Sequence, residues 1–407
     1  MTLWEDREFR RFWLAGLISN AGSALSGVAL PVLMYSLTGS AAYTGALAAL
    51  TAAPYLVFGL VAGALVDRMR RRSVMVVTDL VSAGLLASVP VAAALDALTP
   101  LHLLLVAGGV ASVGVWFDAA GFGAVPALVG TDNLVRANSA IWSTATAVHI
   151  VAPSVAGVLF AIHGPAATMA LDAVSFAVSA ALVRTILRPL NPARQPRASL
   201  TSDIREGLEF LWREPAVRFF LGLGLGQAVA GGAVSGLLVV YAFRVFDVPQ
   251  NDARVGVLFS ALAAGSFAAT VLMPALSDAC DPRRIAAAGL TAGVGVLGLL
   301  VGARAWWLAV LGIALWGLTS TVVIVNGITV RQLITPDRLQ GRVNLVGRMV
   351  TFGVGQPAGA LVGGVLADAL SVRSALVTAA LPLAVAAVVG WSRVVSESGG
   401  ELGHGLK

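Results

Sequence analysis

The sequence predicts an all-α membrane protein in which twelve transmembrane helices form two six-helix bundles. Hydrophobic residues make up 57% of the 407-residue chain and charged residues only 12%, whereas a soluble domain carries about 25% charged residues. Apolar stretches of about 20 residues or more recur along the chain, and each is long enough to cross a bilayer as a helix. In addition, the second half of the chain repeats motifs of the first.

Twelve spans follow from the apolar runs, the glycine and proline breaks, and the charge clusters between them. They cover residues 10–37, 41–66, 73–95, 100–129, 137–162, 165–187, 216–244, 253–278, 283–303, 306–333, 343–366 and 371–393. None shows the alternating polarity over about 10 residues that a transmembrane β-strand has. The first span has too long an apolar part for a signal peptide, and no small-residue cleavage site follows it. All twelve are therefore predicted to be membrane-spanning helices.

The basic residues predict which side of the membrane each loop faces. Of the 27 lysines and arginines, all but Arg244, Arg254, Arg304 and Arg373 fall at the termini or in and beside the loops on the same side as the termini. This asymmetry marks the cytoplasmic side. We therefore expect a multi-pass protein of the bacterial inner (plasma) membrane with both termini in the cytoplasm. The basic excess reflects this topology, so we expect a lipid bilayer and no nucleic acid as a partner.

The longest polar stretch divides the chain into two halves of six spans each. We expect an N-terminal six-helix bundle at residues 1–187, a cytoplasmic linker at 188–215, a C-terminal six-helix bundle at 216–395 and a disordered tail at 396–407. The linker segment TSDIREGLEFLWREP starts with residues that favour a helix start and has apolar residues at helical spacing. It predicts a short amphipathic helix at the membrane surface.

The two halves repeat each other's motifs in the same order. RFWLAGL resembles RFFLGLG, ALVDRMRRR resembles ALSDACDPR, and LVGTDNL resembles LITPDRL, with the second copy 205 to 211 positions after the first. Because six spans separate equivalent positions, both copies have the same orientation in the membrane. Parallel repeats of this kind are related by an axis along the membrane normal. The repeat predicts a substrate cavity between the halves, near the bilayer midplane.

A charged loop follows the second span and contains Gly63, Asp67, Arg68, Arg71 and Arg72. This pattern resembles the loop motif of the major facilitator superfamily. The segments SNAGSALSGVALPVLMYSLTGSA, LDAVSFAVSAALV and GQPAGALVGG resemble its branch of enterobactin-exporter-like and macrolide-efflux-like proteins. The resemblance implies the major facilitator fold, in which two bundles rock to expose one site to each side in turn. It also implies a gate, in which the loop Asp meets the start of the eleventh helix and the arginines meet acids in the outward-open state.

Two interpretations of this loop remain open. It is either such a gate or only a positively charged anchor at the anionic inner surface, although an anchor needs neither Asp67 nor Gly63. An aspartate near a helix start gains typically about 0.3–1 kcal/mol, which suits a latch that must also open. The second half carries an incomplete copy of the loop, from which we expect a weaker latch, formed by Asp278, Arg283 and Arg284.

Ionisable residues inside a span cost roughly 2.5–3.5 kcal/mol on insertion scales, so each is a candidate for function. Asp118, His149 and Asp172 are the candidates for carrying a proton. Each also has a structural interpretation, as an acid satisfied by nearby donors or as a packed histidine. Branch members commonly have an acid after the glycine of the first span, where this chain has Ser23, and many drug/proton antiporters have an arginine in the fourth span that is absent here.

Polar residues inside the spans are expected to line the cavity. The uncharged ones are Asn20, Gln227, Asn326 and Gln356. Arg348, in the eleventh span, is expected either to pair with an acid such as Asp67 or Asp118 or to hold an anionic substrate. Aromatic surface would favour a bulky amphipathic compound, and the residues that could supply it are Trp116, Trp142, Tyr35 and Tyr241.

These features together lead to an expectation of function. The small-residue segments APSVAGVL and QPAGALVGG resemble an antiporter motif and favour export. We expect a monomeric secondary transporter that exports a small amphipathic organic molecule, such as a drug, a macrolide-like compound or a siderophore-like metabolite, in exchange for protons. The alternatives are an uptake or uniport carrier and a non-transporting sensor or assembly protein. No enzymatic activity is expected, because no nucleophile, base and orienting group recur at catalytic spacing. No cofactor or metal is expected either, because Cys280 is the only cysteine and Lys407 the only lysine, which excludes cysteine-rich metal sites and a P-loop.

Overall fold

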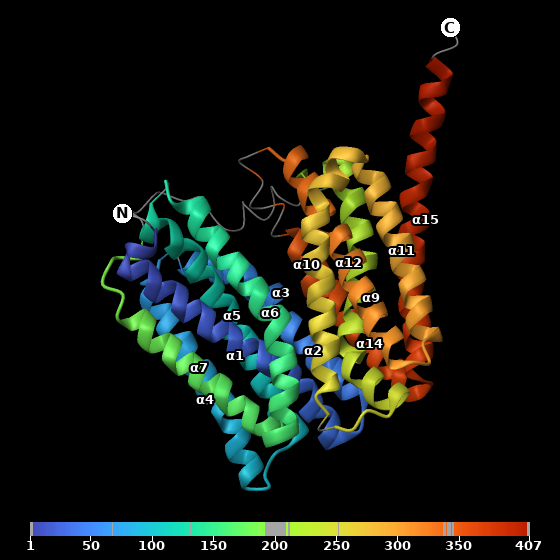
Figure 1. The fold of residues 1–407 in the computed structure, drawn as a ribbon. Helices are drawn as coiled ribbons and strands as arrows, with labels where there is room; N and C mark the ends of the chain where they lie inside the picture. Colours follow the sequence, from blue (N-terminus) through green and yellow to red (C-terminus); the bar gives the residue numbers. More distant parts are fainter. Residues whose placement is uncertain are drawn as a thin grey trace.

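The computed structural model describes residues 3–66, 68–130, 132–191, 209–210, 212–250, 252–336, 339, 343 and 346–404. Within these residues, twelve helices are long and apolar enough to cross a membrane. Each coincides with one of the twelve predicted spans, so the predicted fold class is confirmed. Figure 1 shows the helices as two bundles side by side, one from each half of the chain.

The N-terminal bundle departs from the predicted spans at one point. Its elements are η1 (Leu3–Glu5), α1 (Arg7–Thr38), α2 (Ala41–Ala52), α3 (Pro54–Val66), α4 (Arg71–Ala94), α5 (Pro100–Val129), α6 (Leu134–His163) and α7 (Pro165–Arg184). The sequence predicts one unbroken helix over 41–66, but the structure has α2 and α3, which meet at Ala53. Proline has no backbone N–H and its ring clashes with the preceding turn, so Pro54 begins a new helix.

The C-terminal bundle shows a similar irregularity. Its elements are α9 (Pro215–Phe246), α10 (Arg254–Ala279), α11 (Pro282–Gly302), α12 (Trp306–Ile334), η2 (Met349–Gly355), α14 (Gln356–Ala369) and α15 (Val372–His404). The eleventh span, predicted as a regular helix, begins with the seven-residue π-helical segment η2. A π-helical turn of this kind is often found at functional sites.

The linker helix and the C-terminal tail are the two polar segments for which the sequence made a structural prediction. Most of the predicted amphipathic helix at 201–215 lies outside the described residues; residues 209–210 and 212–213 are helical. The tail predicted to be disordered from residue 396 is instead helical as far as His404, because α15 continues into it. No proline interrupts this stretch, and extending an existing helix orders only one residue per added hydrogen bond.

Short connections with defined caps set the ends of the helices. At the start of α1, the Asp6 carboxylate accepts hydrogen bonds from the backbone amides of Glu8 and Phe9. It also forms an ion pair with Arg188 at 2.8 Å. Partial burial raises the pKa of Asp6, but these bonds outweigh it and hold the pKa below its usual value. At the other end of α1, Gly39 adopts a left-handed conformation with φ of 62°. Such a conformation favours glycine, and it lets the chain reverse within two residues into α2.

The two bundles contact each other mainly through four pairs of elements. α2 packs against α9 and α14, α6 packs against α10, and α3 packs against η2. Figure 1 shows the bundles converging toward the end that carries residues 39–40 and 247–250, here named the latch end. They diverge toward the opposite end, where α1 begins and α15 finishes, here named the linker end. Hydrogen bonds of Asp368 with residues 40–42, of Arg244 with Tyr35 and Gly39, and of Ser154 with Ser260 join the two halves at the latch end.

Candidate functional site

A carboxylate from one half caps a helix of the other half at the latch end. Asp368, near the end of α14, accepts hydrogen bonds from the hydroxyl of Ser40 at 2.5 Å and from the amides of Ala41 and Ala42, both at 2.9 Å. These groups form the first turn of α2, where the amides have no partner within the helix. The positive end of the helix dipole also attracts the negative charge. Asp368 therefore fastens the C-terminal bundle to the N-terminal bundle.

Arg244, at the end of α9, completes this cluster. Its guanidinium forms an ion pair with Asp368 at 2.7 Å, and it donates to the carbonyl of Gly39 at 2.7 Å and to the Tyr35 hydroxyl at 2.8 Å. The guanidinium also lies 5.5 Å from the centroid of the Tyr35 ring. Both charges are only partly exposed, so their bonds are charge-assisted and little weakened by water. We call Tyr35, Ser40, Arg244 and Asp368 the outer latch.

Small residues close the rest of the latch end. A methyl group on Gly45 would collide with the carbonyl of Ala360, which lies on the facing helix α14. On the other helix pair, a methyl on Gly157 would collide with the carbonyl of Ala253, and the hydroxyls of Ser154 and Ser260 lie 2.8 Å apart. Small residues allow helix backbones to approach this closely. The segments APSVAGVL and QPAGALVGG thus form contacts between the halves.

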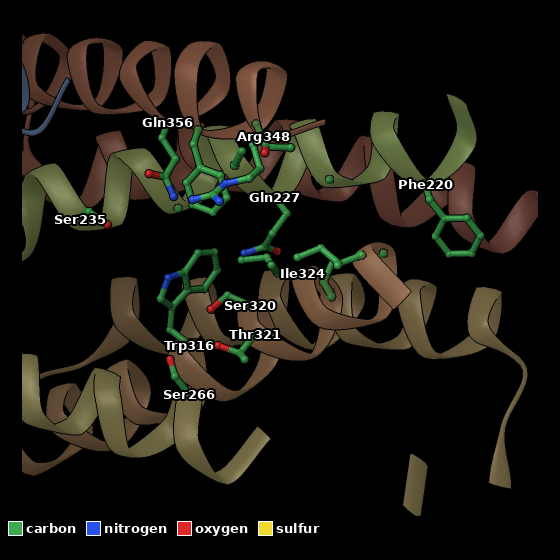
Figure 2. A pocket seen from close by; sticks show the side chains of 18 of the residues that line it. Phe220, Gln227, Ser235, Ser266, Trp316, Ser320, Thr321, Ile324, Arg348 and Gln356 are labelled. Carbon is green, nitrogen blue, oxygen red and sulfur yellow. The ribbon is translucent and has the colours of Figure 1, made fainter. Parts of the chain in front are cut away.

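A cavity of about 220 Å³ lies among α9, α10, α12, η2 and the start of α14, in the wall of the C-terminal bundle (Figure 2). The predicted residues Gln227, Arg348 and Gln356 line it. Trp316, Ser320 and Arg331 also line it, and the sequence analysis did not single them out. Polar side chains on four different segments therefore converge on one space between transmembrane helices.

Arg348 also reaches the N-terminal bundle. Its guanidinium carbon lies 5.2 Å from the centroid of the Tyr55 ring in α3, a distance typical of a cation–π contact. The Tyr55 hydroxyl in turn donates to Asp118 in α5 at 2.7 Å. Among the described contacts, no ion pair within 4 Å joins Arg348 to Asp118, so their pairing stays a prediction. Tyr55, which the sequence analysis missed, connects them.

Two of the predicted cavity residues have other partners. Asn326 is buried and its side-chain amide donates to the carbonyl of Pro282 at 2.8 Å, which ties α12 to the start of α11. Asn20 donates to the carbonyl of Gly16 in its own helix at 2.7 Å. Neither lines the cavity of Figure 2. An amide inside a helix can bond to a nearby carbonyl instead of facing a cavity, as both asparagines do here.

The aromatic residues expected in the cavity lie elsewhere. Tyr35 belongs to the outer latch, and the Tyr241 hydroxyl is buried and donates to the carbonyl of Leu300 at 2.6 Å. Trp142 is 71% exposed, and Trp116 lies 6.4 Å from the ring of Phe58. The aromatic surface of the cavity comes from Trp316, Phe220 and Phe352 instead.

The three candidate proton carriers have different surroundings. Asp118 and His149 are exposed side chains, and His149 lies one helical turn before Pro153 on α6, on the face that contacts α10 at the latch end. Asp172 is buried at 1% exposure and accepts a hydrogen bond from Ser175 at 3.0 Å. Asp79, which was not among the predicted carriers, is also 1% exposed and accepts a hydrogen bond from the Ser179 hydroxyl at 2.7 Å. The only sequence feature that could have identified Asp79 is that it is an acid inside a predicted span.

Arginines of the charged loop bind within their own bundle. Gly63 lies in α3, Arg68 is exposed, and Asp67 lies outside the described residues. Arg71 is buried and donates to the carbonyls of Gly123 at 2.5 Å and Leu190 at 3.1 Å, and Arg72 donates to the carbonyl of Ile186 at 2.7 Å. These carbonyls belong to the N-terminal half of the chain. The gate interpretation concerns contacts with acids in the outward-open state, so it stays a prediction.

The second copy of the loop has a different arrangement. Asp278 and Arg284 are exposed, and Arg283 is partly exposed. The carboxylate at the start of α11 belongs to Asp281, which accepts a hydrogen bond from the amide of Arg283 at 2.8 Å. This cap stays within the loop.

The bundles, the latch and the cavity define a class: a membrane transporter with two six-helix halves. Solved structures with this fold include a bacterial homologue of the lysosomal transporter Spinster in an inward-facing, unoccupied conformation, with a TM-score of 0.78 and 13% identity over 96% of this chain and 97% of that one. The nucleoside transporter NupG gives a TM-score of 0.79 and 14% identity over 95% of this chain and 98% of that one.

The particular family follows from the sequence. The model of the transmembrane secretion effector family matches residues 3–400, and the chain belongs to that family, within the major facilitator superfamily. The chain is 29% identical over 349 residues to the enterobactin exporters EntS of Citrobacter koseri and of Escherichia coli O81, covering 83% of this chain and 80% of each relative. It is a multi-pass protein of the bacterial inner membrane.

Proposed function

We propose that this protein exports a small amphipathic organic molecule from the cytoplasm by alternating access. The observation that carries the proposal is the contrast between the ends: the latch end is closed by bonds between the halves, while the halves diverge toward the linker end. The excess of basic residues beside the termini supports a cytoplasmic linker end. The structure then corresponds to an inward-open state, ready to load from the cytoplasm.

Three further features support export and the two-domain organisation. The relatives named above are exporters, and their names favour outward movement of a substrate. The chemistry of the cavity, with amides, hydroxyls and a tryptophan, suits an organic compound better than an inorganic ion. The proposed cycle assigns residues 1–187 and 216–395 to the two bundles that rock against each other and 188–215 to the linker between them, and it needs neither enzymatic activity nor an oligomer.

Proton exchange is the energy source that we propose. Asp118 is an exposed carboxylate inside a span, and Tyr55 and Arg348 connect it to the cavity. A carboxylate in this position can release a proton in one state and take one up in another as the Arg348 charge moves relative to it. His149, Asp172 and Asp79 are the alternative carriers. The uptake carrier, the uniporter and the non-transporting sensor remain the competing functions.

Accumulation of labelled compounds in pump-deleted cells tests the proposal. The panel contains macrolides, tetracyclines, phenicols, fluorescent dyes and catecholate siderophores, with and without an uncoupler, in cells expressing the wild type, Asp118→Asn or Asp67→Asn. Lower accumulation of one class, abolished by the uncoupler and by Asp118→Asn, is expected. Higher accumulation indicates uptake, and export that persists with the uncoupler and in Asp118→Asn contradicts proton exchange.

The control variant is Asp132→Asn, an acid in the loop before α6 and outside the spans. It is expected to export like the wild type. The gate interpretation of the charged loop is tested in the same assay, because Asp67→Asn should insert normally but export slowly. Normal export by Asp67→Asn would leave the loop as an anchor only.

A further inference from the structure

The inner part of the cavity carries two arginines and no acid. Arg331, in the last turn of α12, and Arg348, just before η2, both line it, and no Asp or Glu is among the described residues that do so. The remaining lining residues are apolar or neutral. A cavity inside a membrane protein with this composition has a positive potential, since few water molecules screen the two charges.

Arg331 is the more informative of the two arginines. It is only 7% exposed, its Nε atom has no hydrogen-bond partner, and no described carboxylate lies within ion-pair distance of its guanidinium. A buried charge without a partner is costly. A guanidinium that served only to anchor the inner end of α12 would extend toward the lipid headgroups. Arg331 instead lines the cavity, so its position is consistent with a partner that arrives with the substrate.

The neighbouring chain segment leaves room for this guanidinium. Gly347, next to Arg348, has no side chain, and a methyl group added there would lie 2.9 Å from Nη1 and 3.0 Å from Cζ of Arg331. Such a distance is shorter than a normal contact between these atoms. Any residue larger than glycine at position 347 would therefore displace the Arg331 guanidinium.

The rest of the cavity suits a flat, partly polar body. Figure 2 shows Gln227, Gln356 and Trp316 extending into one space from three helices. The amides can donate to or accept from a polar substituent, and an indole provides a large apolar face. The volume of about 220 Å³ is below the range of about 300–1,000 Å³ for drug-sized pockets. The cavity therefore holds one ring system, and a larger molecule would extend between the bundles.

We propose that the substrate is an anionic aromatic compound whose carboxylate, or a comparable acidic group, binds Arg331. This proposal rests on the proposed function and narrows the substrate from any amphipathic molecule to one with a negative charge. Arg331 supplies a planar, forked donor that matches a carboxylate with two bonds. Trp316 and the two glutamines hold the ring.

Binding of three matched probes tests the charge preference. The full-length protein in phosphatidylcholine nanodiscs is titrated calorimetrically with 2-naphthoate, 2-naphthamide and 2-(aminomethyl)naphthalene, which differ mainly in charge. Naphthoate is expected to bind at least about tenfold more tightly than the other two, the effect of one charge-assisted contact. Equal binding of the three probes, or no binding of naphthoate, would overturn the proposal.

Variants then locate the preference. Arg331→Gln is expected to weaken naphthoate binding about tenfold or more, Arg331→Lys to retain part of it, and naphthamide binding to stay unchanged in both. The control is Arg304→Gln, an exposed arginine at the latch end. Gly347→Ala leaves the charge in place but crowds it, so it should weaken naphthoate selectively even if Arg331→Gln folds poorly. Thermal unfolding of each variant checks folding. Unchanged naphthoate binding in folded Arg331→Gln, or in Gly347→Ala, contradicts the proposal.

Two further arms separate the substrate from lipid and from the question of export. Loss of naphthoate binding when phosphatidylglycerol replaces part of the phosphatidylcholine would assign the site to a lipid headgroup and reject the substrate proposal. If the protein exports neutral compounds and Arg331→Gln does not change this export, the anionic-substrate proposal is rejected and the export function is retained. If naphthoate binding depends on Arg331 but no compound is exported, the binding site is retained and the export function is rejected.

Discussion

The latch end and the linker end use charged residues in opposite ways. At the latch end, Asp368 and Arg244 of one bundle bind the first turn of α2 and the carbonyl of Gly39 in the other bundle. Near the linker end, Arg71 and Arg72 bind carbonyls of their own bundle. The charged residues at the latch end therefore bond between the two halves, whereas those near the linker end bond within one half.

This difference shows which charges can control the transport cycle. In the proposed cycle, bonds between the halves exist only in the state in which the halves meet, so they would shift the balance between inward-open and outward-open states. Bonds within one half exist in both states, and they stabilise the bundle without favouring either state.

Removing the carboxylate of the outer latch should have the largest effect. Asp368→Ala loses an ion pair and three hydrogen bonds to α2, each charge-assisted bond contributing roughly 1.5–3 kcal/mol. We expect the outward-open population to rise by about tenfold or more and export to fall. The measure is the labelling rate of Ala49→Cys in a Cys280→Ser background, because Ala49 is buried one turn after Gly45 in α2, the helix that packs against α14. The control is Asp252→Ala, whose ion pair with Arg254 at 2.8 Å lies within one loop; an equal effect of both variants would contradict the contrast.

Crowding the contact of α2 with α14 should have the next largest effect. A methyl group on Gly45 would collide with the Ala360 carbonyl, so Gly45→Ala opposes closure of the latch end without altering any charge. Overpacking of this kind costs typically about 1–3 kcal/mol. We expect slower export and higher labelling in the same cysteine assay.

The matched control for this crowding is Gly27→Ala. Gly27 lies in α1, and a methyl group there has nothing within 4 Å. If the two glycine variants export equally well, the small residues at position 45 and on the facing helix have no role in closing the latch end.

Removing Arg71 from the charged loop should reduce the stability of the protein without changing the populations of the inward-open and outward-open states. Arg71→Gln loses the bonds to Gly123 and Leu190 inside the N-terminal bundle. We expect the free energy of unfolding to fall by about 2 kcal/mol, measured by thermal or denaturant unfolding in detergent. The control is Arg70→Gln, because Arg70 is an exposed neighbour of Arg71. It should cause no measurable loss of stability. A shift in state populations without a loss of stability would show that Arg71 acts across the halves.

A pH-dependent effect at the start of α1 should be the smallest. The pKa of Asp6 is below its usual value, so its ion pair with Arg188 adds stability above the unfolded pKa of about 4 and is lost as the pH falls below that. Asp6→Asn keeps the helix cap but loses the ion pair, at about 0.5 kcal/mol for a partly exposed pair. The two proteins should differ in unfolding temperature at pH 7 and agree near pH 3. A constant difference at both pH values would contradict the role of the charge.

The sequence predicted those parts of the fold that depend on composition and local pattern. Twelve apolar stretches gave twelve spans, because a run of about 20 apolar residues has few alternatives to a membrane helix. The break at Pro54 was visible in the sequence, but its effect depends on whether a neighbouring helix can satisfy the freed carbonyl groups. The π-helical segment η2 had no local signal at all.

The site was less predictable, because it depends on contacts between distant segments. Gln227, Arg348 and Gln356 were found because polar residues inside spans are few. Asn326 met the same criterion and bonds to Pro282 instead. Asp368 and Arg244 lie at span ends, where charges are common, and only the approach of α14 and α9 to α2 shows that they join the halves. Tyr55 had no signal apart from its position beside the Pro54 break.

We propose that the outer latch holds the protein in an inward-open state. Cys280, the only cysteine of the chain, is exposed between α10 and α11 near the linker end. A spin label on Cys280 and a second on Arg70→Cys, in the other bundle, report the separation of the halves at that end by electron–electron double resonance in nanodiscs. The account predicts a predominantly long distance in the wild type and a shift toward a shorter one in Asp368→Ala. The same distance distribution in both proteins would contradict it.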